Sequence, residues 1–172
     1  MQPNYAPQRA THRRTENAIL EATKELIAER GVSDISMIEI AERSQVSRAT
    51  LYNHYRDKDA VLSALLDSEV ERLVEIASHG TPAECLENLS LAISTDAALA
   101  GIRRHDPATL SSLLIHGEDP RYLKVAHAVH RLTKQPEATG IAMRWLMAQA
   151  LQPVTPDQAR SQAAALTEAT LF

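Results

Sequence analysis

Residues 46–62 read VSRATLYNHYRDKDAVL. This stretch predicts a short helix over about residues 47–54 and a longer helix that begins after Asp57. Leu51 and Tyr55 are four residues apart, so they share one face of the short helix, and we expect both to face inward with Val46. The polar side chains between them must then point outward or sideways, which is unusual for a helix buried in a core.

A second short helix is predicted just before this one, over about residues 37–43. Ser36 and Glu39 form a capping-box pattern at its start, and Ile40 and Ala41 supply its inward face. Residues 44–46 then form a short turn. Two short helices separated by three or four residues are typical of a helix-turn-helix, whose second helix enters the major groove of DNA.

The outward residues of the second helix suit contact with DNA. Arg48, near the helix start, is a long donor that can make a bidentate contact with guanine, and the small Ala49 allows close approach to the bases. Ser36 lies at a helix N-terminus, where backbone N–H groups favour an anion. Further polar groups that could contact phosphates are Ser47, Thr50, Tyr52, Asn53, His54 and Lys58.

Residues 15–66 resemble the N-terminal domain of the TetR family of transcriptional regulators, and the stretch quoted above carries most of the resemblance. It implies that Arg48 and Ala49 read bases and that Ser36 and Met37 contact the DNA backbone. It implies phosphate contacts for Thr50, Tyr52, Asn53, His54 and Lys58. Gln45 stands at a turn position that is usually glycine, so we expect a left-handed backbone there. The resemblance also implies a ligand-responsive repressor that acts as a homodimer on a palindromic operator.

The rest of the chain predicts an all-α fold. Prolines follow turn or capping residues, and glycines stand where helices should stop. We expect helices over residues 12–30, 57–78, 82–95, 107–115, 120–133, 137–151 and 156–170, with a short turn within 96–105. The predicted organisation is a flexible arm over residues 1–11, the helix-turn-helix domain over 12–56 and a helical regulatory and dimerisation domain over 57–172.

The net charge of −4 resides in residues 61–172, whereas residues 1–60 are neutral overall and contain a basic segment. Arg9, His12, Arg13 and Arg14 are not neutralised by a nearby acid before Glu16. This segment is interpreted either as a disordered tail or as an arm that attracts phosphate without a fixed structure.

The second domain is predicted to bind a small or aliphatic ligand, or none, because the whole chain contains only 3% aromatic residues. Candidate pocket residues are Arg103, His105, His116, Tyr122, Met143, Trp145 and Met147. The helices within 137–170 are rich in alanine and other apolar residues, so we expect them to form the homodimer interface. Burial of these helices within their own domain is the alternative.

Other classes of protein are disfavoured. The chain has 44% apolar and 23% charged residues, a single cysteine (Cys85) and no uncharged apolar run of membrane-spanning length. No nucleophile–base pair, phosphate loop or clustered metal ligands can be defended, so we expect no enzyme activity, no metal and no cofactor. Without a signal-like N-terminus, a cytoplasmic location is expected. A helical ligand-binding or scaffold protein that has lost DNA binding remains the alternative to a regulator.

Overall fold

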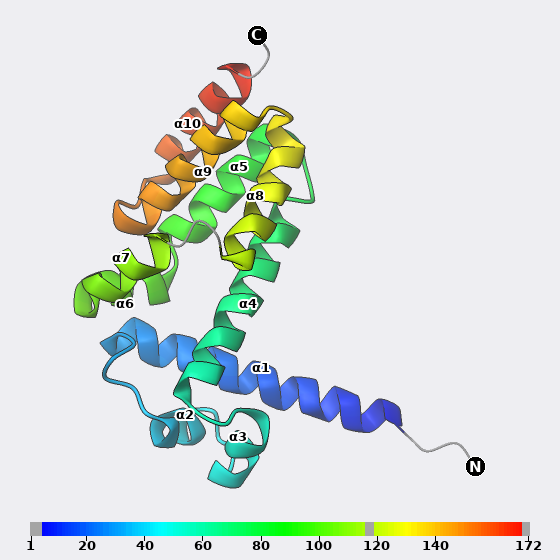
Figure 1. The fold of residues 1–172 in the computed structure, drawn as a ribbon, viewed down its shortest axis with the longest axis vertical. Helices are drawn as coiled ribbons and strands as arrows, with labels where there is room; N and C mark the ends of the chain where they lie inside the picture. Colours follow the sequence, from blue (N-terminus) through cyan, green and yellow to red (C-terminus); the bar gives the residue numbers. More distant parts are fainter. Residues whose placement is uncertain (1–4, 116–118, 170–172) are drawn as a thin grey trace.

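A computed structural model describes residues 5–115 and 119–169 of the chain. This described part forms ten α-helices and contains no β-strand, so the all-α prediction is confirmed (Figure 1). The helices are α1 (Tyr5–Arg30), α2 (Met37–Arg43), α3 (Arg48–His54), α4 (Lys58–Ile76), α5 (Pro82–Ser94), α6 (Ala97–His105), α7 (Pro107–Ile115), α8 (Pro120–Thr133), α9 (Pro136–Leu151) and α10 (Pro156–Ala169). None of them is long and apolar enough to cross a membrane.

Five of the ten described helices begin at a proline, and several of the others begin at a capping side chain. The Thr81 hydroxyl oxygen accepts a hydrogen bond from the Glu84 backbone N–H, and the Thr81 backbone N–H donates to the Glu84 carboxylate. Pro82 occupies the first turn of α5. α7, α8, α9 and α10 also begin at a proline. Residues 96–105 form a full helix rather than the expected short turn, because Asp96 caps the backbone N–H of Leu99 at its start.

α1 begins at Tyr5, seven residues before the expected start at residue 12. Residues 5–11, predicted to belong to a flexible arm, therefore form its first turns. Pro7 does not oppose this start, because the first backbone N–H groups of a helix have no partner within the helix and proline lacks only that group. Arg13 and Arg14, predicted to lie just inside the helix, are exposed on α1.

The first three helices and the start of α4 enclose a small apolar core. Ile19 and Leu26 of α1, Ile40 of α2, Leu51 of α3 and Val61 of α4 are almost completely buried in it. Because each of these helices contributes a face to one core, burial of this apolar surface holds α3 at a fixed angle to α1 and α2.

α4 connects this unit to the remaining helices. In Figure 1 it rises from α2 and α3 to the bundle formed by α5, α8, α9 and α10. Val61 and Leu65 pack in the first core, whereas Leu73, Val74 and Ile76 pack against a second core within the bundle. One continuous helix thus contributes to both cores.

α9 and α10 pack into the second core. Gln149 of α9 is buried and hydrogen-bonded to Ser90 and Ser94 of α5, so its amide does not remain unsatisfied. Ala159 and Ala163 of α10 are also buried, because α10 packs on α5. The outer face of α10 is therefore less apolar than its alanine-rich sequence indicated. Its exposed residues are mainly polar and include Asp157, Gln158, Arg160 and Ser161.

α6 lies directly against α1, and glycine makes this approach possible. A Cβ atom at Gly101 would lie 2.2 Å from the carbonyl oxygen of Ile27 and 2.7 Å from the Cα of Ala28. Both are backbone atoms, which cannot move aside as a side chain can. Gly101 therefore lets α6 approach α1 more closely than any residue with a side chain would allow.

Replacing Gly101 tests this close contact. We expect Gly101→Ala to lower the free energy of unfolding by about 1–3 kcal/mol, because the added methyl group overpacks the α1–α6 contact. Gly140→Ala is the matched control within α9, where a Cβ would meet only the flexible end of Arg144, at 3.0 Å. Urea unfolding should show this control to be neutral or more stable by up to about 1 kcal/mol. Equal destabilisation by both substitutions would contradict the close contact.

Candidate nucleic-acid interface

α2 and α3 are joined by a tight turn that depends on one unusual backbone conformation. Gln45 has a φ of 56°, which confirms the left-handed backbone expected at this position. The turn closes with a hydrogen bond of 3.1 Å from the Val46 N–H to the Ala41 carbonyl. Val46 is partly buried against the first core. The four residues between the helices therefore fix the direction in which α3 leaves the turn.

The inner face of α3 is apolar and its outer face is open. Leu51 is fully buried and Tyr55, directly after the helix, is nearly so, as predicted. The Tyr55 hydroxyl donates to Glu16 at 3.4 Å, and burial raises the pKa of Tyr55 to about 12. Predicted DNA-contacting residues that lie exposed are Ser47, Arg48, Ala49, Tyr52 and Asn53.

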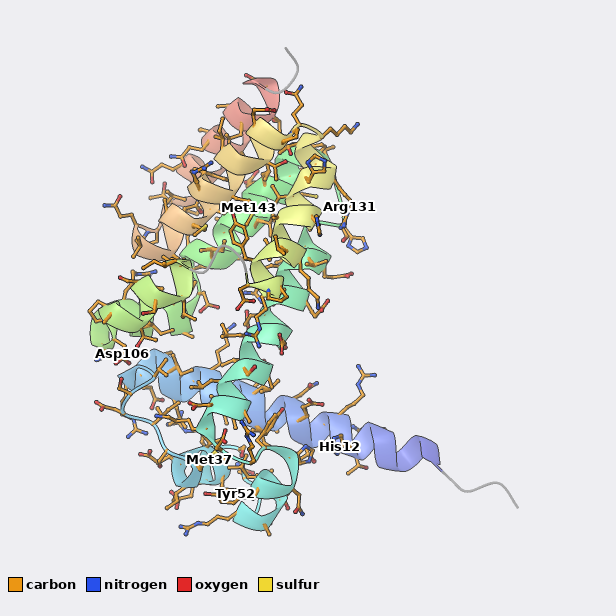
Figure 2. The ribbon with its side chains drawn as sticks, viewed as in Figure 1. His12, Met37, Tyr52, Asp106, Arg131 and Met143 are labelled. Atoms are coloured by element: carbon orange, nitrogen blue, oxygen red, sulfur yellow. The ribbon has the colours of Figure 1, made fainter. Side chains whose placement is uncertain are left out.

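Tyr52 is a large aromatic side chain on the exposed outer face of α3. Its side chain is 53% exposed, and Figure 2 shows it on α3 at the end of the molecule opposite the helical bundle. An aromatic ring that is half exposed gains less from packing than a buried one, and its hydroxyl can reach a partner.

Arg48 is held only loosely. Its guanidinium lies 3.9 Å from the carboxylate of Glu42, and the two side chains are 63% and 70% exposed. An exposed pair at this separation contributes little stability, because water screens the charges. Arg48 can therefore turn toward a partner at small cost.

The start of α3 is capped by hydroxyl groups. The Ser47 side chain accepts a hydrogen bond of 3.0 Å from the Thr50 N–H, and the Ser47 and Thr50 hydroxyl oxygens lie 2.8 Å apart. These contacts fix both side chains next to Arg48.

His54 lies against α1, a contact that the sequence did not reveal. Its ring stacks on that of His12, with 4.1 Å between ring centroids and 19° between planes. Burial lowers the pKa of His54, and the neighbouring His12 lowers it further. Figure 2 shows His12 on the part of α1 that extends beyond α3. The stacking joins the basic segment of α1 to the end of α3.

The Lys58 side chain is engaged in hydrogen bonds within the first domain. Its ammonium group donates to the carbonyl oxygens of Val32, Ser33 and Ile35, at 3.1, 3.4 and 3.1 Å. The predicted phosphate contact would compete with these bonds, because Lys58 already holds the loop between α1 and α2.

Met37, the first residue of α2, is half-buried against the first core.

Ser36 caps α2 as predicted, and its hydroxyl is engaged in doing so. It donates to Glu39 at 2.7 Å, and the Glu39 carboxylate also accepts from Arg30 at 2.8 Å. The bond from Ser36, and then the bond from Arg30, hold the pKa of Glu39 below its usual range. This network anchors the first turn of α2 to the end of α1.

Three of the residues predicted to line a ligand pocket meet in the second core, and the others lie elsewhere. Met143 is buried in the second core, and Tyr122 and Trp145 are partly buried against it. Arg103 donates to the carbonyl of Ala150 at 2.7 Å, and His105 is exposed. Met147 is half-buried, and His116 lies outside the described residues.

A cavity of about 320 Å³ is present at a different place, between the first unit and the bundle. None of the seven predicted pocket residues lines it. The sequence reasoning had selected polar and polarisable side chains, whereas the walls of the cavity are mainly aliphatic. Its lining residues are Lys24, Ile27, Val32, Leu62, Leu65, Leu66, Glu69, Val70, Arg72, Leu73, Ala92, Ile93, Asp96, Ala98, Leu99, Ile102, Thr109 and Leu113.

No group of three or more metal-ligating His, Cys, Asp or Glu side chains occurs among the residues that the structure describes.

The open helix-turn-helix, supported by a helical bundle, defines a class of protein: a helical protein with an N-terminal helix-turn-helix unit. Residues 19–65 match the family model for bacterial regulatory proteins of the tetR family. The helix-turn-helix unit of this chain therefore matches the TetR family, as the resemblance implied.

Curated relatives match the same region. The transcriptional repressor Rv3405c of Mycobacterium tuberculosis is 36% identical over 70 residues, which are 41% of this chain and 37% of that protein. The transcriptional regulator TtgR of Pseudomonas putida is 30% identical over 91 residues, which are 49% of this chain and 43% of that protein. The matches thus cover less than half of each relative.

Solved structures share the fold over most of the chain. The dihydroxyacetone kinase operon activator DhaS has a TM-score of 0.65 at 15% identity, covering 90% of this chain and 94% of that one. The TetR family repressor AlkX from Dietzia has a TM-score of 0.62 at 17% identity, covering 91% and 95%. At these identities the likeness concerns the fold alone.

Proposed function

We propose that this protein is a sequence-specific DNA-binding transcriptional regulator whose α3 enters the major groove. The observation that carries the proposal is the exposed polar face of α3, with Arg48 and Tyr52 held outward by the burial of Leu51 and Tyr55. A helix with one inner apolar face and an outer face of donors fits the groove and can reach base edges.

Within this interface, Arg48 reads a guanine and Ala49 lies close to the bases. Ser47, Thr50, Tyr52 and Asn53 are assigned to phosphate contacts. His54 contributes through its stacking on His12, while Ser36, Met37 and Lys58 act chiefly by positioning α2 and the loop before it. Arg13 and Arg14 are exposed on α1 and add positive charge that attracts the DNA backbone.

The proposed domain boundaries follow from these contacts. The helix-turn-helix domain extends from the start of α1 to about residue 56, and α4 connects it to a regulatory and dimerisation domain over residues 57–172. A ligand bound in the second domain is proposed to change operator affinity. Repression in the absence of that ligand is supported by the relative that is named a transcriptional repressor.

A homodimer is proposed because one recognition helix reads only half of a palindromic site. The exposed residues of α9 supply the interface: Glu137, Ile141, Arg144, Ala148 and Leu151 recur every three or four residues. Ile141 and Leu151 are 56% and 51% exposed, so their apolar surface is available to a second copy. α10 contributes to this interface mainly through exposed residues such as Ala165.

Arg48→Ala tests the role of α3 in reading DNA. Bound duplexes are first selected from a random pool with the wild-type protein, and the winner is then titrated by fluorescence anisotropy. We expect Arg48→Ala to weaken binding by about 1–3 kcal/mol and to relax selectivity at one position in each half-site.

The matched control is Arg131→Ala, which removes the same charge from α8 in the bundle, away from α3 (Figure 2). It should retain wild-type affinity. If both substitutions weakened DNA binding equally, the loss would be explained by the change in net charge and not by a contact of Arg48. Failure to enrich any sequence would favour the alternative, a helical scaffold that has lost DNA binding.

The dimer interface is tested by Ile141→Glu. A carboxylate in a buried apolar contact is costly, so we expect the dimer dissociation constant to rise by about tenfold or more in sedimentation velocity. Leu123→Glu is the control, because Leu123 of α8 is 45% exposed in the same domain but lies outside the α9 surface. A dimer that is broken by Leu123→Glu and not by Ile141→Glu would move the interface to α8.

A further inference from the structure

The 320 Å³ cavity lies where the two parts of the protein meet. Ile27 and Val32 come from α1 and the loop that follows it, whereas Ile93, Leu99 and Leu113 come from α5, α6 and α7. α4 contributes Leu62, Leu65, Leu66, Val70 and Leu73. The walls therefore belong to both domains, and a molecule in the cavity touches both.

The charged groups at the cavity neutralise one another. The Lys24 ammonium lies 2.6 Å from Glu69 and 2.9 Å from Asp96, and Arg72 lies 2.7 Å from Glu69 and 3.8 Å from Asp96. Two cations thus face two carboxylates. Burial opposes the charge on Lys24, but its bonds to Glu69 and Asp96 outweigh this effect and hold its pKa above the usual value.

This pairing leaves no free charge for a ligand. An anionic ligand would have to displace Glu69 or Asp96 from Lys24, and a cationic ligand would have to displace Lys24 or Arg72. Asp96 is difficult to displace, because its side chain is only 9% exposed and it also caps the first turn of α6. Either exchange would leave a partly buried charge without its partner, which is costly.

We propose that this cavity binds an uncharged, hydrocarbon-rich small molecule. Its walls supply aliphatic side chains for the hydrocarbon part, and Thr109 and the outer oxygens of the ion cluster can accommodate one hydroxyl or carbonyl group. A dry apolar cavity of about 150 Å³ accommodates benzene, so a volume roughly twice as large corresponds to about a dozen non-hydrogen atoms.

The cavity is placed to affect α3, and this part of the inference rests on the proposed function. α6 is attached to the first domain at both ends. Asp96, at its start, binds Lys24 of α1. Asp106, at its end, accepts hydrogen bonds from the backbone N–H groups of Val32 and Ser33 and from the Ser33 hydroxyl. Figure 2 shows Asp106 beside the end of α1.

These attachments limit how a ligand can be accommodated. Gly101 holds the middle of α6 against α1, so the cavity cannot expand by moving α6 alone without breaking a close contact. A ligand that fills it therefore biases the position of α4 and α6 relative to α1. That bias is regulatory only if the ligand has different affinities for the DNA-binding and released arrangements.

The first test uses the full-length protein without DNA. 1-Octanol, octanoate and octylammonium share one hydrocarbon chain and differ in charge. Calorimetric titration should show saturable binding of one 1-octanol per chain, with octanoate and octylammonium weaker by about tenfold or more. Carbon-13 spectra of isoleucine methyl groups should show shifts at Ile27, Ile93 and Ile102 and none at the distant Ile141. No saturable 1-octanol binding, equally tight binding of either ion, or shifts centred elsewhere would overturn the assignment.

Cavity filling supplies the matched variants. Ala92→Phe places a ring on the α5 wall and should abolish 1-octanol binding, while Ala108→Phe adds the same atoms at an exposed site on α7 that does not line the cavity. Retained binding in Ala92→Phe would contradict the assignment. If Ala92→Phe fails to fold, the isoleucine methyl shifts of the wild-type protein still show whether 1-octanol binds in this cavity.

A separate titration distinguishes this inference from the proposed function. Operator affinity is measured without and with saturating 1-octanol, and we expect a change of about fivefold or more. Loss of specific DNA binding in the absence of 1-octanol would refute the proposed function and leave the cavity assignment standing. Unchanged affinity for the operator with 1-octanol bound would overturn the regulatory part alone.

Discussion

Burial of Leu51 and Tyr55 fixes which side of α3 faces solvent, and the functional conclusions depend on this constraint. Because both residues insert into one core with α1, α2 and α4, the helix cannot rotate without exposing apolar surface. The left-handed Gln45 and the bonds from Lys58 to the preceding loop fix its direction as well. Arg48 and Tyr52 are therefore presented to a partner on a rigid element, which keeps the entropic cost of binding small.

Two helices, α4 and α6, link the two domains. α4 extends from the first core into the second, while α6 contacts α1 at both ends and in the middle. An apolar cavity enclosed by these elements lies at the place where small shifts of α4 and α6 would be transmitted to the first domain. The ion cluster of Lys24, Glu69, Arg72 and Asp96 closes this junction without a net charge. The proposed DNA interface and the proposed ligand site thus depend on one set of contacts.

Sequence reasoning was most successful where the cause of a structure is local. Capping residues and prolines predicted the ends of α5, α7 and α8 closely, and the spacing of Leu51 and Tyr55 predicted the inner face of α3. It failed where distant segments meet. Lys58 binds carbonyl groups more than twenty residues earlier in the chain, and His54 stacks on His12, which lies more than forty residues earlier. The cavity was missed because its aliphatic walls look like ordinary core in the sequence, whereas the selected Met143 and Trp145 serve the second core.

The central claim is that two copies of α3 enter the major groove of one DNA site. Methylation interference on the selected duplex tests this most directly, because it modifies guanine N7, the atom that lies in the major groove beside the proposed Arg48 contact. Two clusters of interfering guanines are predicted, about 10–10.5 base pairs apart or at a multiple of that spacing, on one face of the duplex. Tight binding that is unaffected by methylation of any guanine would contradict the account, since the protein would then hold the DNA through its phosphates alone.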